Sequence, residues 1–430
     1  MWEYYDLCLI NPPAPWLVHP HAQAPLGLLY LAAAAEHAGG HVTIRNLAGA
    51  GDKPRHWRFP HASVYGVTGT YQHIAIVNAL CQEIKTRSRL SRVLVGGPIA
   101  LSRDELDMDY IDTVILGEAE NEIRWLQFKA GPPFLEGTPT DVKNVPWPAR
   151  HLWAGPFGGN VFIEGKNYFG GGSATIITSR GCPFSCAFCA SQSLLARKVR
   201  RRDPADVVGE MERCIMDYGV RQFRFSDEFL TVGRKHALAL SESIRKSKAL
   251  GHGEGVAWRA SIGINPHDRE LFKALRAAGC REVSFGVESA DPAVLGLLTN
   301  KHHVEDVPPA LLNAREAGLQ TRALMMVGLP GSTHETGRLN NVFLRACAAD
   351  AIAVTVFTPV PGCDIVMHPE RYGCRLIPER IQRSLCMYGP QGRNVIEPTI
   401  EVDGLDDEAF ARQMRETVNL VEGMHRIGHG

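Results

Sequence analysis

Short apolar runs alternate with longer amphipathic stretches along the first third of the chain. The runs are rich in Val, Ile and Leu, which is typical of buried strands. They lie at residues 5–13, 41–47, 63–71, 92–100 and 113–120. Residues 25–40 and 73–88 have the spacing of helices and end in glycine or polar residues. Strands that alternate with helices in this way predict a doubly wound, Rossmann-like parallel sheet.

A second alternating series follows a connection rich in proline and glycine near residues 130–170. Its predicted strands lie at residues 174–179, 222–228, 257–264, 282–289, 321–330 and 352–362. Six β/α repeats are too few for a closed eight-stranded barrel, so they predict a partial (β/α)6 barrel of the TIM type. The predicted fold class is therefore α/β. It has a sheet domain at 1–135, a linker at 136–172, the partial barrel at 173–365 and a short, mainly helical C-terminal region at 366–430.

Composition narrows the class of protein. The chain has 430 residues with 46 basic and 46 acidic side chains, which gives no electrostatic reason to expect a nucleic-acid partner. The basic run at residues 197–202 favours a solvated loop over a site for an anionic substrate group. The N-terminus has no secretory pattern, and the longest apolar stretch, residues 26–35, is too short to span a bilayer. We therefore expect a cytoplasmic enzyme without membrane contacts.

Three cysteines, Cys182, Cys186 and Cys189, lie within eight positions directly after the first predicted barrel strand. In a chain expected to be cytoplasmic, such a cluster indicates metal binding or catalysis rather than disulfides. A structural zinc site, a group of catalytic thiols and an iron–sulfur cluster are the candidates. Zinc takes a closed set of four ligands, and the chain has no second Cys-x-x-Cys or Cys/His pair. A four-iron cluster held by three thiolates would leave one iron open for a substrate or cofactor.

Polar residues recur where the predicted barrel strands end, which is where barrels of this type build their active sites. These residues are Asp227, Glu228, Arg259, Glu288 and Ser289. Charged residues in otherwise apolar strands are costly to bury unpaired, so paired or functional roles are favoured. In the first sheet, the glycine-bearing turns at 66–70 and 96–98 follow strands and allow a bulky ligand to approach the backbone.

The segment Cys182-Pro-Phe-Ser-Cys186-Ala-Phe-Cys189 resembles the Cys-x3-Cys-x2-Cys signature of the radical S-adenosylmethionine (SAM) superfamily, including the aromatic Phe188. The first domain, with LINPP, VGGP and LGEAE, resembles the cobalamin-binding domain of the cobalamin-dependent branch. The resemblance implies that the three cysteines hold a 4Fe–4S cluster whose open iron chelates SAM. It also implies that one electron from the cluster cleaves SAM to methionine and a 5′-deoxyadenosyl radical. An electron donor such as flavodoxin or ferredoxin and a small-molecule substrate are the implied partners.

The same resemblance implies a SAM site around the cluster. By this resemblance, the guanidinium fork of Arg259 pairs with the SAM carboxylate. The amine and ribose are met by Asp227, Glu228, Glu288 and Ser289. Phe188 lies near the adenine, and the segment Met325 to Gly328 packs on it. For the last segment, a buried strand and turn without cofactor contact is the alternative.

Cobalamin, by this resemblance, docks on two turns of the first sheet, formed by Thr68, Gly69, Thr70, Gly96, Gly97 and Pro98. The chain has no Asp-x-His-x-x-Gly motif, so we expect no histidine ligand below the cobalt. Ile99 stands where the branch often has a histidine. The alternative is a sheet that has kept its fold and lost its ligand.

Cys363 follows the last predicted barrel strand, where it would face the substrate as a catalytic hydrogen-atom donor or acid/base thiol. An inert buried thiol is the alternative. Three functions stay open. The domain order favours cobalamin-dependent methylation of an unactivated carbon in a small molecule of natural-product type. Cys363 motivates a non-methylating epimerase, isomerase or oxidative cyclase. A non-catalytic iron–sulfur or cobalamin sensor is disfavoured by the charges at the strand ends.

Overall fold

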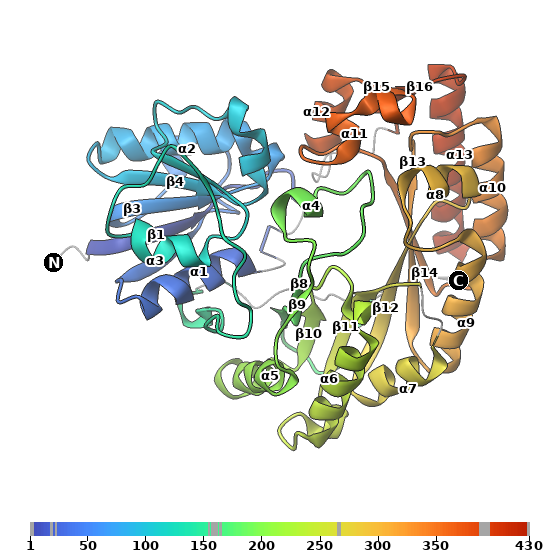
Figure 1. Ribbon diagram of the computed structural model, residues 1–430, viewed down its shortest axis with the longest axis horizontal. Coiled ribbons are helices and arrows are strands. Elements are labelled where there is room, and N and C mark those ends of the chain that lie inside the picture. Colours follow the sequence, from blue (N-terminus) through green and yellow to red (C-terminus); the bar gives the residue numbers. More distant parts are fainter. Residues whose placement is uncertain are drawn as a thin grey trace. The chain divides into compact units, whose positions relative to one another are not determined.

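The computed structural model describes residues 4–17, 20–21, 24–153, 155, 162, 166–264, 268–386 and 396–427. These residues form two compact units. The first contains the described residues up to Gly155 together with Ser191–Ala196, and the second contains the other described residues from Phe162 onward. Each unit is built on a six-stranded parallel sheet with helices, so the predicted α/β fold class is confirmed (Figure 1).

The sheet of the first unit has the strand order β2-β1-β3-β4-β5-β6. Its strands are β1 (Tyr4–Asn11), β2 (Val42–Asn46), β3 (His61–Thr68), β4 (Arg92–Gly96), β5 (Thr113–Leu116) and β6 (Phe134–Glu136). Helix α2 (Ile74–Arg87) covers one face, and α1 (Leu26–His37) and α3 (Glu120–Leu126) cover the other. Because β1 lies between β2 and β3, the strand order reverses there. Sheets of this kind bind ligands at the carboxyl ends of the strands beside that point.

Strand β6 lies where the sequence predicted the end of the first domain and the start of the linker. It has three residues and pairs with β5, and such a short edge strand carries no periodic signal. The chain after β6 is fastened by buried glutamates. The backbone N–H and hydroxyl of Thr138 donate to Glu122 at 3.0 and 2.8 Å, and the backbone N–H of Thr140 donates to Glu118 at 3.0 Å.

The sheet of the second unit has the strand order β14-β13-β12-β11-β10-β7, and all of its neighbours are parallel. Its strands are β7 (Ser173–Ile176), β10 (Gln222–Phe225), β11 (Ala257–Ile262), β12 (Cys280–Glu288), β13 (Gln320–Val327) and β14 (Ala351–Val356). The helices between them are α5 (Pro204–Tyr218), α6 (Arg234–Lys246), α7 (Arg269–Ala277), α8 (Pro292–Leu298), α9 (Val307–Glu316) and α10 (His334–Ala346). This is the predicted partial barrel.

The two faces of this second sheet differ in burial. Along β13 every second residue is buried and the residues between are partly exposed. On β12, Val283, Phe285 and Val287 are fully buried, which fits a face covered by helices. Because successive side chains point to opposite faces, Ser284 and Gly286 lie on the other face, which lines the interior of the partial barrel.

The basic run does not form the solvated loop that the sequence favoured. Arg200–Arg201 form β9, which pairs antiparallel with β8 (Ser179–Arg180). Arg202 is buried and lies 2.6 Å from Glu210 and 2.7 Å from Asp206 of α5. A local charge pattern does not reveal acidic partners on the following helix, so the expectation was wrong for these residues.

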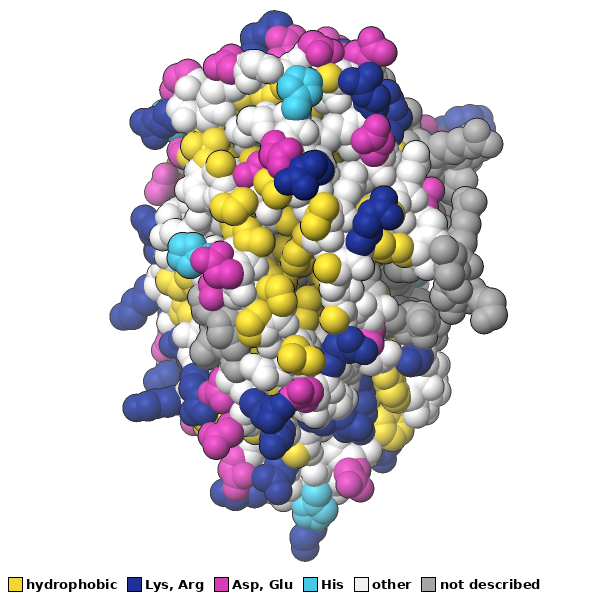
Figure 2. Space-filling view, turned by 90° about the vertical axis from the view of Figure 1, so that its right-hand side faces the viewer, with side chains coloured by type: hydrophobic (Ala, Val, Ile, Leu, Met, Phe, Trp, Pro, Cys, Tyr) yellow, Lys and Arg dark blue, Asp and Glu magenta, His cyan; other side chains and the backbone are white. Residues whose placement is uncertain are grey.

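The C-terminal part of the chain packs against the end of the partial barrel. It contains α11 (Asp364–Met367), α12 (Pro378–Cys386), α13 (Asp407–Ile427) and the antiparallel strands β15 (Cys374–Leu376) and β16 (Ile400–Val402). Helix α13 packs against α10 and against the edge strand β14. Figure 2, in which the right-hand side of Figure 1 faces the viewer, shows hydrophobic side chains gathered among charged ones. Within the described ranges, no helix is both long and apolar enough to cross a bilayer.

Candidate active site

The three predicted cluster cysteines lie on one loop, between β8 and α4 (Ser191–Leu194). Cys186 is buried, and Cys182 and Cys189 are partly exposed. Burial raises the pKa of the Cys182 and Cys186 thiols, and for Cys186 this is opposed by Lys301 and by the Thr299 hydroxyl, whose oxygen lies 3.1 Å from the sulfur. In the described part of the chain, no three His, Cys, Asp or Glu side chains are grouped to hold a metal ion. Thiolate donors on a single loop are nevertheless the donor set that iron–sulfur clusters take.

Backbone hydrogen bonds anchor the middle of this loop. The N–H of Ala187 donates to the carbonyl of Leu298 at 2.8 Å, and the carbonyl of Ala187 accepts from the N–H of Ile365 at 3.2 Å. Leu298 ends α8 and Ile365 lies in α11, so elements distant in sequence position the cysteines.

Asp227 anchors the chain that leads into the loop. Its carboxylate accepts hydrogen bonds from the N–H of Thr178 at 2.7 Å and from the hydroxyls of Thr178 and Ser179 at 2.5 and 2.7 Å. Burial raises the pKa of Asp227, against the effect of these hydrogen bonds. Asp227 thus has a positioning role that the sequence did not indicate, and its predicted contact with the SAM amine stays a prediction. Glu228, beside it, is half-buried, and its charge contributes to the raised pKa of Cys182.

Glu288 and Lys301 form an ion pair next to the cysteine loop. The Lys301 Nζ lies 2.8 Å from Oε1 of Glu288, and their side chains are only 8% and 13% exposed. The ammonium lies over the rings of Phe188 and Phe229, at 5.6 and 5.2 Å from the ring centroids. Burial lowers the pKa of Lys301, but the charges of Glu288 and Cys186 outweigh it and the net shift is upward.

Glu288 has a backbone φ of 65°, a conformation that costs a non-glycine residue energy, and the pairing of β12 with β13 shifts register beside it. This strain at the end of β12 aims the carboxylate at Lys301. Strained residues of this kind gather at functional sites.

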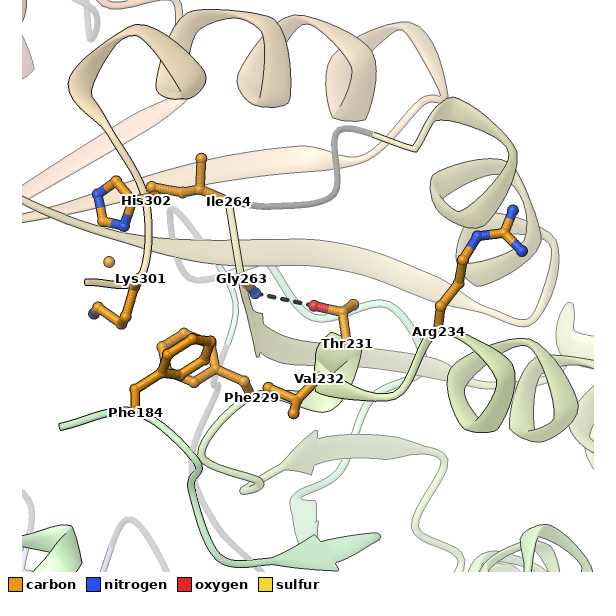
Figure 3. Close-up of a pocket in the computed structure, with 10 residues that line it drawn as sticks. Phe184, Phe229, Thr231, Val232, Arg234, Gly263, Ile264, Lys301 and His302 are labelled. Atoms are coloured by element: carbon orange, nitrogen blue, oxygen red, sulfur yellow. Dashed lines mark hydrogen bonds between the residues drawn. The ribbon is translucent and has the colours of Figure 1, made fainter. Parts of the chain in front are cut away.

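A cavity of about 280 Å³ opens beside the ion pair (Figure 3). Phe184 of the cysteine loop and Phe229 meet edge to face in its wall, with ring centroids 5.8 Å apart. Gly263 also lines it, and its N–H donates to the Thr231 hydroxyl at 3.0 Å. Figure 3 shows Lys301 at one side of the cavity and Arg234 pointing away from it. Sequence reasoning missed Phe184, Phe229 and Lys301, because single residues in loops carry no periodic or spacing signal.

Arg259 does not lie at the end of its strand. It is the third residue of β11. Its Nη1 lies 3.2 Å from Oε1 of Glu282, which is near the start of β12. Gly263, which lines the cavity, follows four positions later, a rise of about 13 Å along a strand. The expected position of Arg259 at the end of its strand was therefore wrong. Alternation places inward-facing side chains all along a strand and not only at its carboxyl end. The pairing of Arg259 with the SAM carboxylate stays an untested prediction.

Ser289 and Gly328 face the C-terminal side of the barrel. The Ser289 hydroxyl accepts from the N–H of Asp291 at 3.1 Å and donates to Asn340 at 3.4 Å, so it ties α8 to α10. Gly328 has a φ of 83°, and a Cβ there would lie 3.1 Å from the Met414 side chain of α13. Met325 faces the covered side of the sheet and is buried. Met325 and Gly328 match the alternative of a buried strand and turn. The adenine contact of this segment and the SAM contact of Ser289 both stay predictions.

Cys363 is fully buried in a hydrophobic cluster that also contains Ala187 of the cysteine loop, Val327 and Phe357. Burial raises the pKa of its thiol, with a smaller contribution from Cys189. This environment is what an inert core thiol requires. The catalytic role of Cys363 stays a prediction.

In the first unit, the two turns predicted to dock cobalamin contact each other. The carbonyl of Gly69, after β3, accepts from the N–H of Ile99 at 2.9 Å. Gly97, after β4, has φ 82° and ψ −166°, a conformation that is essentially restricted to glycine. Thr70 caps the following turn together with His73, whose pKa burial lowers to about 4. The turns thus form one rigid backbone surface at the carboxyl edge of the sheet.

Replacing Gly97 by alanine is expected to destabilise the first unit by about 1–3 kcal/mol from backbone strain alone. An added Cβ would also lie 2.6 Å from the Thr68 hydroxyl, which must then move. Thermal unfolding measures the loss. Gly27→Ala is the matched control: it lies in the first turn of α1 and nothing lies within 4 Å of its Cβ, so it should leave stability unchanged or raise it slightly. Equal melting temperatures for the two variants would contradict this reading of the turn.

Comparison with known proteins defines the class. Residues 176–339 match the family model of the radical SAM superfamily, a region that contains the cysteine loop, Asp227 and Glu288. The partial barrel therefore contains a radical SAM domain, and the expectation from the cysteine spacing is confirmed.

Particular relatives resemble the chain over most of its length. It is 25% identical over 364 residues to an uncharacterized methyltransferase of Pyrococcus horikoshii, which covers 79% of this chain and 76% of that protein. It is 23% identical to the cytidylyl-2-hydroxyethylphosphonate methyltransferase of Streptomyces wedmorensis, over 86% of this chain and 83% of that protein. The structure of the radical SAM methyltransferase TsrM from Kitasatospora setae, with cobalamin and a [4Fe-4S] cluster bound, superposes with a TM-score of 0.70. The superposition has 20% identity and covers 97% of this chain and 91% of that one.

Proposed function

We propose that this chain is a cobalamin-dependent methyltransferase that cleaves SAM reductively and methylates an unactivated carbon of a small molecule. The observation that carries the proposal is the presence in one chain of two sites. One is a rigid pair of turns at the carboxyl edge of a Rossmann-like sheet, and the other is a three-cysteine loop beside a cavity in a partial barrel. The similarity to methyltransferases over most of the chain supports the same assignment.

The residues present suit both groups. Cys182, Cys186 and Cys189 would hold the 4Fe–4S cluster, which supplies the electron for SAM cleavage when it is bound and reduced by a donor such as flavodoxin or ferredoxin. Residues 68–70 and 96–98 would hold cobalamin as the methyl carrier. The chain's own residues position the site. Asp227 holds the chain that leads into the cysteine loop, and the Glu288–Lys301 ion pair places a carboxylate and an ammonium beside the cavity. Phe184 and Phe229 give that cavity an apolar wall.

The proposal is tested with full-length protein reconstituted anaerobically with iron, sulfide and hydroxocobalamin. We expect an optical spectrum with both cluster and cobalamin bands after gel filtration. With SAM and a reductant, we expect S-adenosylhomocysteine from methylation of cobalamin and 5′-deoxyadenosine from reductive cleavage. If 5′-deoxyadenosine formed while cobalamin was neither retained nor methylated, the methyltransferase proposal would be abandoned in favour of a non-methylating radical enzyme.

A further inference from the structure

Small polar residues line the interior of the partial barrel next to the cavity. Gly263 and Gly286 line the cavity itself. Two positions earlier along the chain lie Ser261 of β11 and Ser284 of β12, which are paired in register. Residues two apart on a strand share a face, so both serines face the interior. Ser261 is partly exposed, so the interior is open to water at this level.

Arginines lie at the level of these serines and two residues further toward the amino ends of the strands. Arg224 of β10 is in register with Arg259 of β11, which is in register with Glu282 of β12. Arg322 of β13 is in register with Ser284. Arg259 Nη1 donates to Oε1 of Glu282 at 3.2 Å, and Arg322 Nη2 lies 3.1 Å from the same oxygen. We call Arg224, Arg259, Arg322 and Glu282 the arginine cluster.

The arginine cluster has more positive than negative charge. Glu282 is its one carboxylate, is fully buried and is shared by two arginines. Arg224 forms no ion pair with any residue that the structure describes, and burial, followed by the charge of Arg322, lowers its pKa. The Nε of Arg322 is buried and has no hydrogen-bond partner among the described residues. Arg259 and Arg322 are 17% and 26% exposed and share one carboxylate, and partly buried cations are stabilised by further pairing, so the cluster has room for another acceptor.

We infer that the arginine cluster binds an oxyanion, a carboxylate or phosphate, that is carried by the substrate. Guanidinium groups hold such groups with paired, charge-assisted hydrogen bonds. Along the strands, Arg322 lies about 7 Å and Arg224 about 13 Å from the level of Gly286 in the cavity wall. The substrate is thus a small molecule with an anionic end in the barrel interior and its reacting carbon in the cavity. This inference rests on the proposed function, because only that proposal assigns the cavity to the reaction.

Calorimetric titration of the reconstituted full-length protein with inorganic phosphate, and separately with acetate, in a buffer free of other oxyanions tests the inference. We expect at least one of the two probes to bind, and Arg224→Gln and Arg322→Gln each to weaken that binding about tenfold, the usual effect of removing one charged hydrogen bond. Arg245→Gln is the matched control, because it removes an arginine that is 54% exposed on the outer helix α6. This control should bind the probe like the unchanged protein.

Glu282→Gln separates the inference from general damage to the barrel. It removes the cluster's carboxylate, so it should tighten oxyanion binding while the two arginine variants weaken it. Weaker binding in Glu282→Gln, unchanged binding in Arg224→Gln, or no binding of either probe overturns the inference. Displacement of the bound probe by SAM would assign the arginines to the SAM carboxylate and would also overturn it. Because these are binding measurements, their outcome is independent of whether cobalamin is methylated.

Discussion

Replacing Cys186 by alanine is expected to abolish iron and sulfide binding and, with it, reductive cleavage of SAM. Cys186 is the buried member of the three thiols, and its neighbours Ala187 and Cys189 are held by backbone hydrogen bonds. The loop cannot shift another thiol into its place without breaking the contacts of Ala187 with Leu298 and Ile365. Iron and sulfide analysis of the reconstituted protein measures the first effect. Formation of 5′-deoxyadenosine measures the second.

The matched control for this prediction is Cys347→Ala. Cys347 is a partly exposed thiol at the end of α10, outside the cysteine loop. Its removal should leave iron content and SAM cleavage at the level of the unchanged protein. A Cys186→Ala protein that kept a full complement of iron and sulfide would show that the cluster is not held by this loop.

The two sheets could be predicted from the sequence because their signal is local. Each strand from β1 to β5 is a short apolar run next to a turn or helix, and burial of β1 and β3 follows from those runs. The three-cysteine loop was equally visible, since its ligands lie close together in sequence. Strand β6 and the pair β8–β9 were missed because two or three residues form each strand and only pairing defines them.

The charges of the candidate site could be named from the sequence, but their partners could not. Glu288 was expected at a strand end and lies there, yet its partner Lys301 comes from the loop after α8. Arg259 was placed at the wrong level, because alternation shows which face a residue takes and not how far along the barrel it lies. Asp227 was identified as polar and buried at a strand end, but its hydrogen bonds to Thr178 and Ser179 depend on the neighbouring strand.

Replacing Lys301 by methionine is expected to destabilise the barrel and to weaken SAM binding strongly. The variant leaves Glu288 buried without its cation, and breaking a buried ion pair in this way costs about 3–5 kcal/mol. The double variant Lys301→Met, Glu288→Gln removes both charges and should recover most of the lost stability. If the pair also orients SAM, the double variant should still bind SAM at least about tenfold more weakly than the unchanged protein, since charged hydrogen bonds are lost.

Thermal unfolding and equilibrium binding of SAM to the reconstituted protein separate these two effects. Lys246→Met is the matched control: it breaks the ion pair with Glu242 on the outer helix α6, whose side chains are 75% and 53% exposed. A pair this accessible to water contributes about 0–1 kcal/mol, so the control should unfold and bind SAM almost as the unchanged protein does. Recovery of SAM affinity together with stability in the double variant would limit the Glu288–Lys301 pair to a structural role. Unchanged stability in Lys301→Met would show that the pair does not form.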